Sequence, residues 1–288
     1  MVGWIDEWWM RLLAGLLGSG FCAFAAYKAR SLSVSGAWSA VTMGTGFIVL
    51  GEPVWFGCLA AFFVSSSLWS KWKRKARAKA NAEAKYAKGG RRDAGQVWAN
   101  GGAGLALCAA HAIWPHEGWL FAFIGVMASV NADTWATEIG ALSRTAPRSV
   151  TSGKRVEPGT SGGVTPLGSA AALAGAAFIG AVAAWLLGPA LAGDGAASEG
   201  LAAAAPAAAW IAVAAAAGLA GAFADSLLGA TGQAMYRCRV CGSDTERAAH
   251  CGTAARHERG FAALTNDRVN LLSSLLAGLI AYGISLLL

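Results

Sequence analysis

A repeated alternation of long apolar stretches and short polar ones limits what this chain can fold into. A helix that crosses a bilayer needs about 20 mostly apolar residues, and eight stretches come near that length. The stretch 32–50 is the weakest because it is rich in Ser, Thr and Gly, and a re-entrant or broken helix is an alternative for it. We therefore predict an all-α bundle of about eight transmembrane helices that forms one domain over residues 1–288. The stretches are 8–27, 32–50, 54–70, 95–114, 118–140, 164–187, 207–233 and 268–288.

The composition supports a membrane protein and disfavours other classes. Hydrophobic residues make up 56% of the chain and charged residues only 14%, whereas a typical soluble domain is about 25% charged. A disordered chain, a secreted disulfide scaffold and a soluble enzyme all fit this balance poorly. The 38 Gly and 13 Trp residues are typical of closely packed membrane helices with aromatic anchors at the interfaces.

The positions of the 23 Lys and Arg residues predict the orientation of the helices. With eight spans, the segments that carry most of these residues lie on one side, and those on the other side carry acidic residues but no Lys or Arg. By the positive-inside rule the basic segments face the cytoplasm and both termini lie outside. The net charge of +7 is therefore mainly a topology signal, and we expect no nucleic-acid partner. The basic segments are the one that contains Lys28 and Arg30, and the segments 71–92, 141–160 and 234–264.

The first apolar stretch and the basic run 71–88 predict how the protein is located relative to the membrane. We expect the first stretch to remain as a helix and not to be a cleaved signal peptide, because no basic segment precedes it and no A-x-A site stands out. The protein is then an integral membrane protein, of the plasma membrane if it is bacterial. The basic run 71–88 is expected to be a solvated or headgroup-facing helix, with a direct substrate role as the alternative.

Four acidic residues are predicted near the cytoplasmic ends of the spans. Asp133 and Glu138 lie in NADTWATEIG, Asp225 in GAFADSLLGATGQ and Asp267 in TNDRVN. Ionisable residues at membrane depth are costly and usually functional. On an ideal helix Asp133 and Glu138 differ by about 140°, so they could share a metal ion only if the helix breaks or a loop partner joins them.

A glycine-rich segment precedes the sixth span. The sequence TSGKRVEPGTSGGVTPLG, residues 151–168, combines two basic residues with a run of Gly, Ser and Thr. Such a run lets backbone N–H groups approach an anion, and the following helix N-terminus adds a favourable dipole. It is not a Walker A motif, because the order of Lys and Gly is wrong. A phosphate cradle and a flexible hinge are the two interpretations. The candidate residues are Lys154, Arg155, Gly159, Thr160, Ser161, Gly162 and Gly163.

Polar side chains also recur at helical spacing before the fourth span and at the start of the eighth. In a bilayer such residues either bond a neighbouring helix or face a cavity, and the sequence leaves both alternatives open. The residues are Arg91, Arg92, Gln96 and Asn100 in KGGRRDAGQVWANGG, and Asn266 and Asn270 in TNDRVN. Carboxylates, amides, basic residues and a glycine-rich loop at one interface are the parts that Mg²⁺-dependent phosphoryl transfer needs.

The cysteines fall into two groups. Three are predicted inside spans, where they pack as small apolar residues. The other three lie in the last cytoplasmic loop, in CRVCGSDTERAAHC. A CxxC followed by Cys and His is typical of a small structural Zn²⁺ site, and the cytosol disfavours a disulfide. The predicted ligands are Cys238, Cys241, Cys251 and His250, with His257 as the alternative to His250 because His250 is adjacent to Cys251.

Several of these motifs together resemble one known family. NADTWATEIG, GTSGGVTPLG, ADSLLGATGQ, CRVCG with HCG, and NDRVNLLSS occur in that order between about Lys88 and Ser274. They are similar to the integral membrane proteins called domain of unknown function 92, or the transmembrane protein 19 family, which includes a phytyl-phosphate kinase of plant chloroplasts. This chain has NADT where other members often have a Gly before the Asp.

The resemblance implies a CTP-dependent kinase that converts a prenyl monophosphate, such as phytyl, geranylgeranyl or farnesyl phosphate, to the diphosphate in isoprenoid salvage. The CxxC element is absent from some members, so catalysis is not expected to depend on it. The residues that match the family motifs are Asp133, Thr134 and Glu138; Gly159, Thr160, Gly162 and Gly163; Asp225 and Ser226; and Asn266, Asp267 and Asn270.

The resulting hypothesis is an enzyme at the cytoplasmic face of the membrane. The four acids hold Mg²⁺; Lys154, Arg155, Arg91 and Arg92 neutralise phosphates; and the segment 159–163 wraps them. A transporter or lipid flippase is the first alternative, because intramembrane acids and a faint ADT/ADS repeat suit it. A cytidylyltransferase that forms a CDP-lipid is the second. The oligomeric state stays open, with a homo-oligomer as one alternative.

Overall fold

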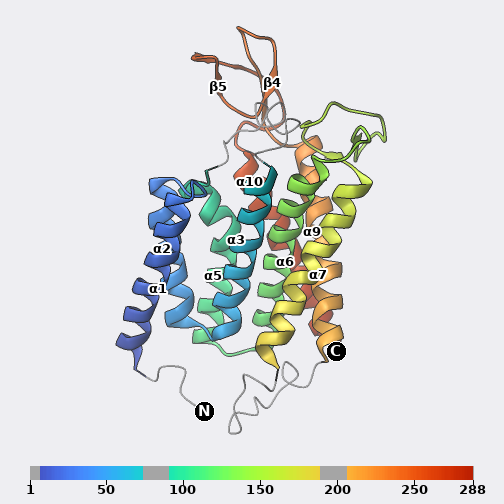
Figure 1. Cartoon of the computed structure of the whole chain (residues 1–288). Helices are drawn as coiled ribbons and strands as arrows, with labels where there is room; N and C mark the ends of the chain where they lie inside the picture. The colour runs from blue at the N-terminus through green and yellow to red at the C-terminus, as the bar shows by residue number, and fades with distance from the viewer. Residues whose placement is uncertain (1–6, 74–90, 189–205, 288) are drawn as a thin grey trace.

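The predicted apolar stretches fold into helices. The computed structural model describes residues 7–73, 91–188 and 206–287, and the described helices run alternately up and down the bundle (Figure 1). The helix α2 is unbroken over its 17 residues, so the broken-helix alternative for this stretch does not hold. The helices are α1 (Trp8–Lys28), α2 (Val34–Leu50), α3 (Pro53–Lys73), α5 (Ala94–Ile113), α6 (Glu117–Gly140), α7 (Pro166–Leu187), α9 (Ala207–Thr231) and α10 (Asn266–Ser285).

Five of these helices are long and apolar enough to cross a membrane, namely α1, α3, α7, α9 and α10. The helix α2 is apolar but shorter. The central helix α6 is not among the five, and it is buried continuously from Leu120 to Ala132. A helix enclosed by other helices does not need a lipid-facing apolar surface, and α6 accordingly carries Asn131, Asp133 and Glu138.

The helix α6 is the centre of the bundle and packs against α3, α5, α7, α9 and α10. Small residues let the helix backbones approach closely. A β-carbon at Gly218 would lie 2.9 Å from Ala128 on α6, and one at Gly125 would lie 2.6 Å from the Ala277 carbonyl oxygen on α10. Aromatic side chains fill the wider spaces, with the rings of Phe121 and Trp210 stacked at 4.3 Å. The apolar core therefore lies around α6.

Three of the four helix starts at the upper end of Figure 1 are fixed by short polar signals. Ser33 accepts a hydrogen bond from the Gly36 amide at 3.1 Å at the start of α2. A capping box of Asp93 and Gln96 begins α5. Thr165 accepts from the Gly168 amide at 3.0 Å, and a proline opens α7. Thr265 precedes α10 without a side-chain cap.

The described strands are short and lie at the same upper end of the bundle (Figure 1). They form an antiparallel pair within the glycine-rich segment and two small sheets in the segment between α9 and α10. The sequence analysis did not predict these strands. They are β1 (Arg148–Ser149) with β2 (Gly163–Val164); β4 (Asp244–Thr245), β3 (Met235–Arg237) and β7 (Arg256–Arg259); and β5 (Ala249–His250) with β6 (Thr253–Ala254).

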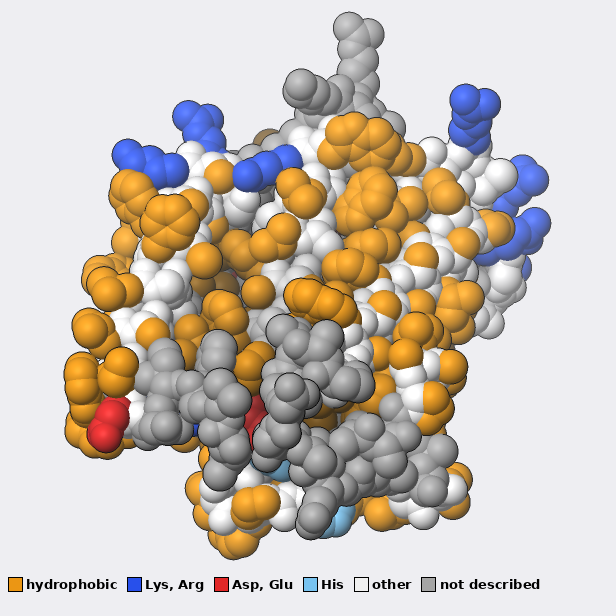
Figure 2. Space-filling model, turned by 60° about the horizontal axis from the view of Figure 1, so that its bottom comes forward, with side chains coloured by type: hydrophobic (Ala, Val, Ile, Leu, Met, Phe, Trp, Pro, Cys, Tyr) orange, Lys and Arg blue, Asp and Glu red, His pale blue; other side chains and the backbone are white. Residues whose placement is uncertain are grey.

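The described polar segments 141–165 and 232–265 project from one end of the bundle, whereas α1 begins and α10 ends at the opposite end (Figure 1). The outside of the helices is mainly hydrophobic, and the visible Lys and Arg side chains gather mainly toward the upper end (Figure 2). The side of a membrane that this end faces stays a prediction. Residues 74–90 of the basic segment and 189–205 of the predicted outer connector lie outside the described residues.

Candidate functional site

A cavity of about 520 Å³ lies under the segment 141–165 at the upper end of the bundle. We call it the loop cavity. Its walls come from the last turns of α6, the start of α7, the middle of α9 and the glycine-rich segment. Three of the motifs found in the sequence therefore meet at one cavity. Their residues in its lining are Asp133 and Thr137, Gly159, Thr160 and Gly163, and Ser226.

The glycine-rich segment is held against α9 by close backbone packing. Gly162 has a φ of +78°, a conformation that favours glycine. A β-carbon at Gly162 would clash with Ala230 and would lie 2.7 Å from the Ser226 carbonyl oxygen. The Ser161 hydroxyl donates to Gln233 Oε1 at 3.2 Å, and the Val150 amide donates to the Gly162 carbonyl at 2.9 Å. The segment is therefore fixed beside Ser226, which disfavours the flexible-hinge interpretation for these residues.

The acids Asp133 and Asp225 lie on neighbouring faces of α6 and α9. These helices approach so closely that a β-carbon at Gly221 would lie 2.7 Å from Ser129 Cβ. Asp225 and Asp133 each follow these residues by one helical turn, so they continue the same contact. Their carboxylates are near enough to repel each other electrostatically. Two acids from separate helices thus converge beside the loop cavity.

Polar groups of α10 and α5 surround Asp225 on its other side. The Ser273 hydroxyl donates to Asp225 Oδ2 at 3.1 Å. With its amide nitrogen toward the acid, Asn270 donates to the same oxygen at 2.9 Å and to the Asn266 carbonyl at 3.2 Å. In the opposite orientation the Asn270 nitrogen lies 3.5 Å from Asn100 Oδ1. Asn270 therefore bonds a neighbouring helix in either orientation, whereas Asn100 lines a cavity; both alternatives for these polar residues occur.

Glu246 is a third acid near this pair that the sequence analysis did not single out. It follows β4 in the segment that carries the cysteines, and its charge acts on both Asp133 and Asp225. The pairing of Tyr236 with Thr245 sets its position, and Thr245 is fully buried. The only signal in the sequence is its place between the CxxC and His250. The small sheet above the bundle therefore contributes a charge to the site below it.

Glu138 does not lie with Asp133. The helix α6 is unbroken to Gly140, so the two side chains keep the separation of about 140° expected from the helical repeat. The Ser70 hydroxyl on α3 donates to Glu138 Oε1 at 2.7 Å, and the Arg92 guanidinium attracts the same carboxylate. Of the two conditions for a metal site shared by Asp133 and Glu138, a broken helix or a loop partner, the first is not met.

Asp267 is also separate from the loop cavity. It lies in the first turn of α10, where a negative charge stabilises the helix dipole, and, like Asp225, it is not among the residues that line the cavity. Within residues 7–73, 91–188 and 206–287, the four acids do not form a group of three or more ligands within 4.8 Å. The structure thus corrects the predicted arrangement of Asp133, Glu138, Asp225 and Asp267 around one ion.

The remaining candidate residues separate into exposed and cavity-lining positions. Lys154 and Arg155 are exposed on the loop, Arg91 is exposed before α5, and none of them lines the loop cavity. The Thr134 hydroxyl donates to Val130 O of its own helix at 2.9 Å. A second cavity on the other side of the bundle is lined by three more predicted residues, Arg92, Gln96 and Asn100.

The Cys/His segment forms a compact group of potential metal ligands. One ligand atom of each of Cys238, Cys241, His250 and Cys251 lies within 4.8 Å of the others. His250 Nδ1 is 3.5 Å from Cys241 Sγ and 3.3 Å from Cys251 Sγ. Tetrahedral Zn²⁺ with Zn–S of ~2.3 Å and Zn–N of ~2.0 Å places S and N about 3.5 Å apart. The group therefore fits Zn²⁺, and the adjacency of His250 and Cys251 does not prevent it.

The surroundings of Cys238 and Cys241 favour thiolates. The amide of Cys241 donates a hydrogen bond to Cys238 Sγ, and this lowers the pKa of Cys238 to about 7. A hydrogen bond with Ser243 lowers the pKa of Cys241. The pKa of Cys251, in contrast, is raised to about 11 by a hydrogen bond with the Cys241 side chain. His257 instead packs edge-on against Tyr236 at 5.4 Å. Between the two predicted alternatives, His250 is the residue placed with the cysteines.

Comparison with known proteins supports the family resemblance. The model of the family described as Integral membrane protein DUF92 matches residues 17–278. This chain belongs to that family. Protein PGR of Arabidopsis thaliana is 31% identical over 92% of this chain and 93% of its own length. The Uncharacterized membrane protein MJ0933 of Methanocaldococcus jannaschii is 35% identical over 43% of this chain and 44% of its own. No solved structure matches the chain.

Proposed function

We propose that this integral membrane protein is a CTP-dependent prenyl-phosphate kinase and that the loop cavity binds the triphosphate. The observation that carries the proposal is the meeting of Asp133, the glycine-rich segment and Ser226 around one cavity. Two acids, Asp133 and Glu157, several hydroxyls and the glycine-rich segment surround a space of about 520 Å³. Such a space suits a phosphate chain with its metal ion, since ligand pockets commonly span about 300–1,000 Å³. The choice of CTP and of a prenyl acceptor rests on the family resemblance.

The reaction requires positioning more than a proton acceptor. An oxygen of the prenyl monophosphate attacks the γ-phosphorus, the bond from that phosphorus to the β–γ bridging oxygen breaks, and CDP leaves with the electron pair. The acceptor is already an anion, so no general base is assigned. Phosphoryl transfer of this kind is accelerated mainly by alignment and by stabilisation of negative charge.

Different residues bind the phosphates and attract the nucleotide. The backbone of residues 159–163 wraps the phosphates, because the fixed left-handed conformations at Gly159 and Gly162 let amide groups approach an anion. Ser226 offers a hydroxyl on the α9 side. The nearby cations of the loop, Lys154 and Arg155, are exposed and supply positive charge that draws the nucleotide to this end.

Asp133 and Asp225 are the residues that would hold Mg²⁺ with the nucleotide. Mg²⁺ is usually bound by one or two carboxylates together with substrate phosphates and water, so a pair is sufficient and the two more distant acids are not required. Bound there, the ion would neutralise charge on the transferred phosphoryl group. Two adjacent carboxylates that repel each other are stabilised by a cation, and Ser273 keeps Asp225 in place.

The end of the bundle with the loop cavity is proposed to face the cytoplasm, where CTP is available. The basic residues at this end support that orientation by the positive-inside rule. We further infer that the Cys238, Cys241, His250 and Cys251 group binds a structural Zn²⁺, which orders the small sheet and so fixes Glu246 beside the acids.

A transporter is the first competing function. It would need polar residues along a path through the membrane. The acids and amides of the family motifs instead gather near one end of the described helices, which favours chemistry at a surface. Cytidylyl transfer is the second, and its product separates it from the kinase: it releases pyrophosphate and leaves CMP on the lipid.

The decisive assay uses the full-length protein in phospholipid nanodiscs with Mg²⁺, a prenyl monophosphate and CTP labelled at either the α- or the γ-phosphate. The proposal expects a prenyl diphosphate by mass spectrometry that carries only the γ-label. A product that carries the α-label would assign cytidylyl transfer instead. No lipid product with phytyl, geranylgeranyl or farnesyl phosphate, together with solute uptake into liposomes, would assign transport.

A further inference from the structure

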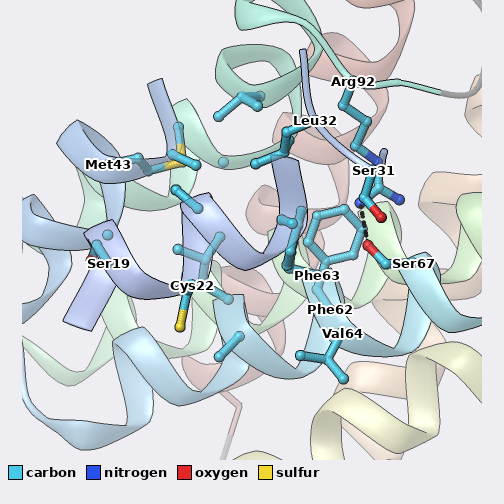
Figure 3. A pocket seen from close by; sticks show the side chains of 18 of the residues that line it. Ser19, Cys22, Ser31, Leu32, Met43, Phe62, Phe63, Val64, Ser67 and Arg92 are labelled. Carbon is cyan, nitrogen blue, oxygen red and sulfur yellow. Dashed lines mark hydrogen bonds between the residues drawn. The ribbon is translucent and has the colours of Figure 1, made fainter. Parts of the chain in front are cut away.

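A second cavity, of about 410 Å³, lies between α1, α2, α3 and α5. We call it the interhelical cavity. Figure 3 shows apolar side chains from three helices turned toward it, with Cys22 on α1, Met43 on α2 and Phe63 on α3, and with Arg92 at one end (Figure 3). Nothing proposed above uses this cavity.

The interhelical cavity opens sideways to the outside of the bundle. The helix α1 packs mainly against α2, where Gly15 and Gly44 allow close contact with Thr45 and Ser19, and this leaves a gap toward α3. The lining residues Phe21, Val64 and Leu68 are 74%, 54% and 62% exposed. These residues lie along the apolar helices, where a membrane protein is surrounded by the hydrocarbon of the bilayer. The cavity is therefore accessible to a lipid chain.

Arg92 is fixed at the polar end of the cavity by the turn between α1 and α2. Its amide donates to the Ser31 carbonyl at 2.9 Å, and its carbonyl accepts from the Ser33 amide at 2.9 Å. Gly36 leaves no room for a β-carbon beside the Arg92 carbonyl oxygen. A backbone held on both sides limits where the side chain can reach, so the position of the guanidinium is set by the fold.

The side chain of Arg92 lies over aromatic rings and leaves donors available. Its guanidinium carbon is 5.3 Å from the Phe62 ring centre and 5.6 Å from that of Phe63, and Nη1 donates to Ser67 Oγ at 3.5 Å (Figure 3). A guanidinium has five N–H donors, more than this one bond uses. Ring contacts orient the planar group and preserve its charge.

The charges at this end of the cavity sum to a positive value. Lys71 also lines it and follows Ser67 on the same face of α3. Arg92 and Lys71 are the charged residues in the described lining of the cavity, and both are positive; Glu138 attracts Arg92 from α6 but does not line the cavity. An apolar space that ends at a net positive group is complementary to a molecule with a hydrocarbon chain and an anionic head.

We propose that the interhelical cavity binds an acidic phospholipid of the surrounding leaflet, with its phosphate at Arg92 and Lys71 and one acyl chain between α1 and α3. An arginine fork matches phosphate oxygens in geometry and charge. The lipid is not the phosphate acceptor of the proposed reaction, because the two cavities share no lining residue and α6 stands between them. The proposal does not depend on kinase activity, since binding is measured without nucleotide.

The test is native mass spectrometry of the full-length protein released from detergent with added lipid. Phosphatidylglycerol is expected to remain bound in preference to phosphatidylcholine of the same chains. Arg92→Gln is expected to weaken phosphatidylglycerol binding about tenfold, as for loss of a charge-assisted contact. Arg144→Gln, an exposed arginine on the loop, is the control and should change binding less than twofold. Equal retention of the two lipids by the wild-type protein would overturn the proposal.

A second pair of variants tests the apolar part without changing charge. Ala60→Phe narrows the cavity that Ala60 lines and is expected to displace the lipid, whereas Ala216→Phe on the exposed face of α9 should retain it. Circular dichroism melting curves for all four variants establish that they fold. Retention of phosphatidylglycerol by a folded Ala60→Phe protein would contradict the proposal. So would binding of prenyl monophosphate alone, because it would assign the cavity to the acceptor.

Discussion

The loop cavity and the interhelical cavity lie on different sides of α6 and are built from different parts of the chain. The loop cavity is formed by α6, α7, α9 and a folded polar segment, and its lining includes an acid, hydroxyls and glycines. The interhelical cavity is formed by the first helices and α5, and its lining is apolar except near one end. One space suits a polar, highly charged ligand and the other a hydrocarbon chain, so the nucleotide and the acidic phospholipid are assigned to separate cavities.

The largest loss of activity is expected for substitutions of the acid pair Asp133 and Asp225. It tests whether the loop cavity is the site of the reaction. Asp133→Asn and Asp225→Asn should each reduce kcat by about 10²-fold or more, a typical loss for one charge-stabilising group, because the metal loses a ligand. Steady-state assays with prenyl monophosphate and CTP measure this. Glu52→Gln, at the opposite end of the bundle, is the matched control. Equal activity of the three variants would remove the loop cavity from the reaction.

The next effect concerns the glycine-rich segment. Gly162→Ala is expected to lower kcat/KM about tenfold or more, because the β-carbon meets Ala230 and the left-handed conformation costs about 1–2 kcal/mol. Gly153 has a similar φ of +67° but open space around it. Gly153→Ala therefore carries the same strain without the clash, and its kcat/KM should fall much less. A similar loss in both variants would mean that strain alone, and not the contact with α9, controls activity.

Metal removal tests the link between the small sheet and the loop cavity. The purified protein is expected to contain one Zn²⁺ per chain by elemental analysis, and Cys241→Ser should lose it. Activity should then fall several-fold but not vanish, because the sheet positions Glu246 and does not line the loop cavity. His257→Ala keeps the four ligands and is the control. Full activity in zinc-free protein would separate the sheet from the site.

A smaller effect is expected at Ser273, which donates to Asp225. Ser273→Ala removes one hydrogen bond to a charged group, worth about 1.5–3 kcal/mol. Because water can replace the hydroxyl and recover most of this energy, kcat should fall only about threefold. The neighbouring Ser274 donates to the Leu271 carbonyl instead. Ser274→Ala serves as the comparison in the same assay. A greater loss in the Ser274 variant would contradict the assigned orientation of Asp225.

The smallest effect is expected at Glu138, which belongs to the other side of α6. Glu138→Gln keeps the shape of the side chain and the hydrogen bond from Ser70. Because an ion pair outside the reaction site contributes only about 0–1 kcal/mol, kcat should change less than about threefold. The comparison with Asp133→Asn in one preparation is the measurement. If Glu138→Gln is as severe as Asp133→Asn, both acids act in catalysis and the two sides of α6 are not independent.

Much of the fold followed from the sequence. Apolar stretches of about 20 residues, interrupted by basic segments, predicted the described helices within a few residues. The same reasoning could not anticipate that α6 would be enclosed on nearly all sides. Burial inside a bundle and burial in lipid select similar apolar side chains, so only the contacts at Gly125 and Gly218 reveal the difference.

The site was predictable in part. The motifs around Asp133, Gly162 and Ser226 were each visible in the sequence, and the structure brings them to one cavity. Helical periodicity also indicated that Glu138 and Asp133 would point apart. The role of Glu246 could not be found this way, because its position depends on a short sheet whose strands have two to four residues. The interhelical cavity depends on how α1 leans away from α3, which no local pattern encodes.

The most direct test is a crystal structure of the protein in a lipidic phase with a non-hydrolysable CTP analogue and Mn²⁺ in place of Mg²⁺. Anomalous scattering locates the ion without ambiguity. The account predicts Mn²⁺ between Asp133 and Asp225, with the triphosphate in the loop cavity against residues 159–163. An ion bound at Glu138 or Asp267, or a nucleotide outside the loop cavity, would contradict it.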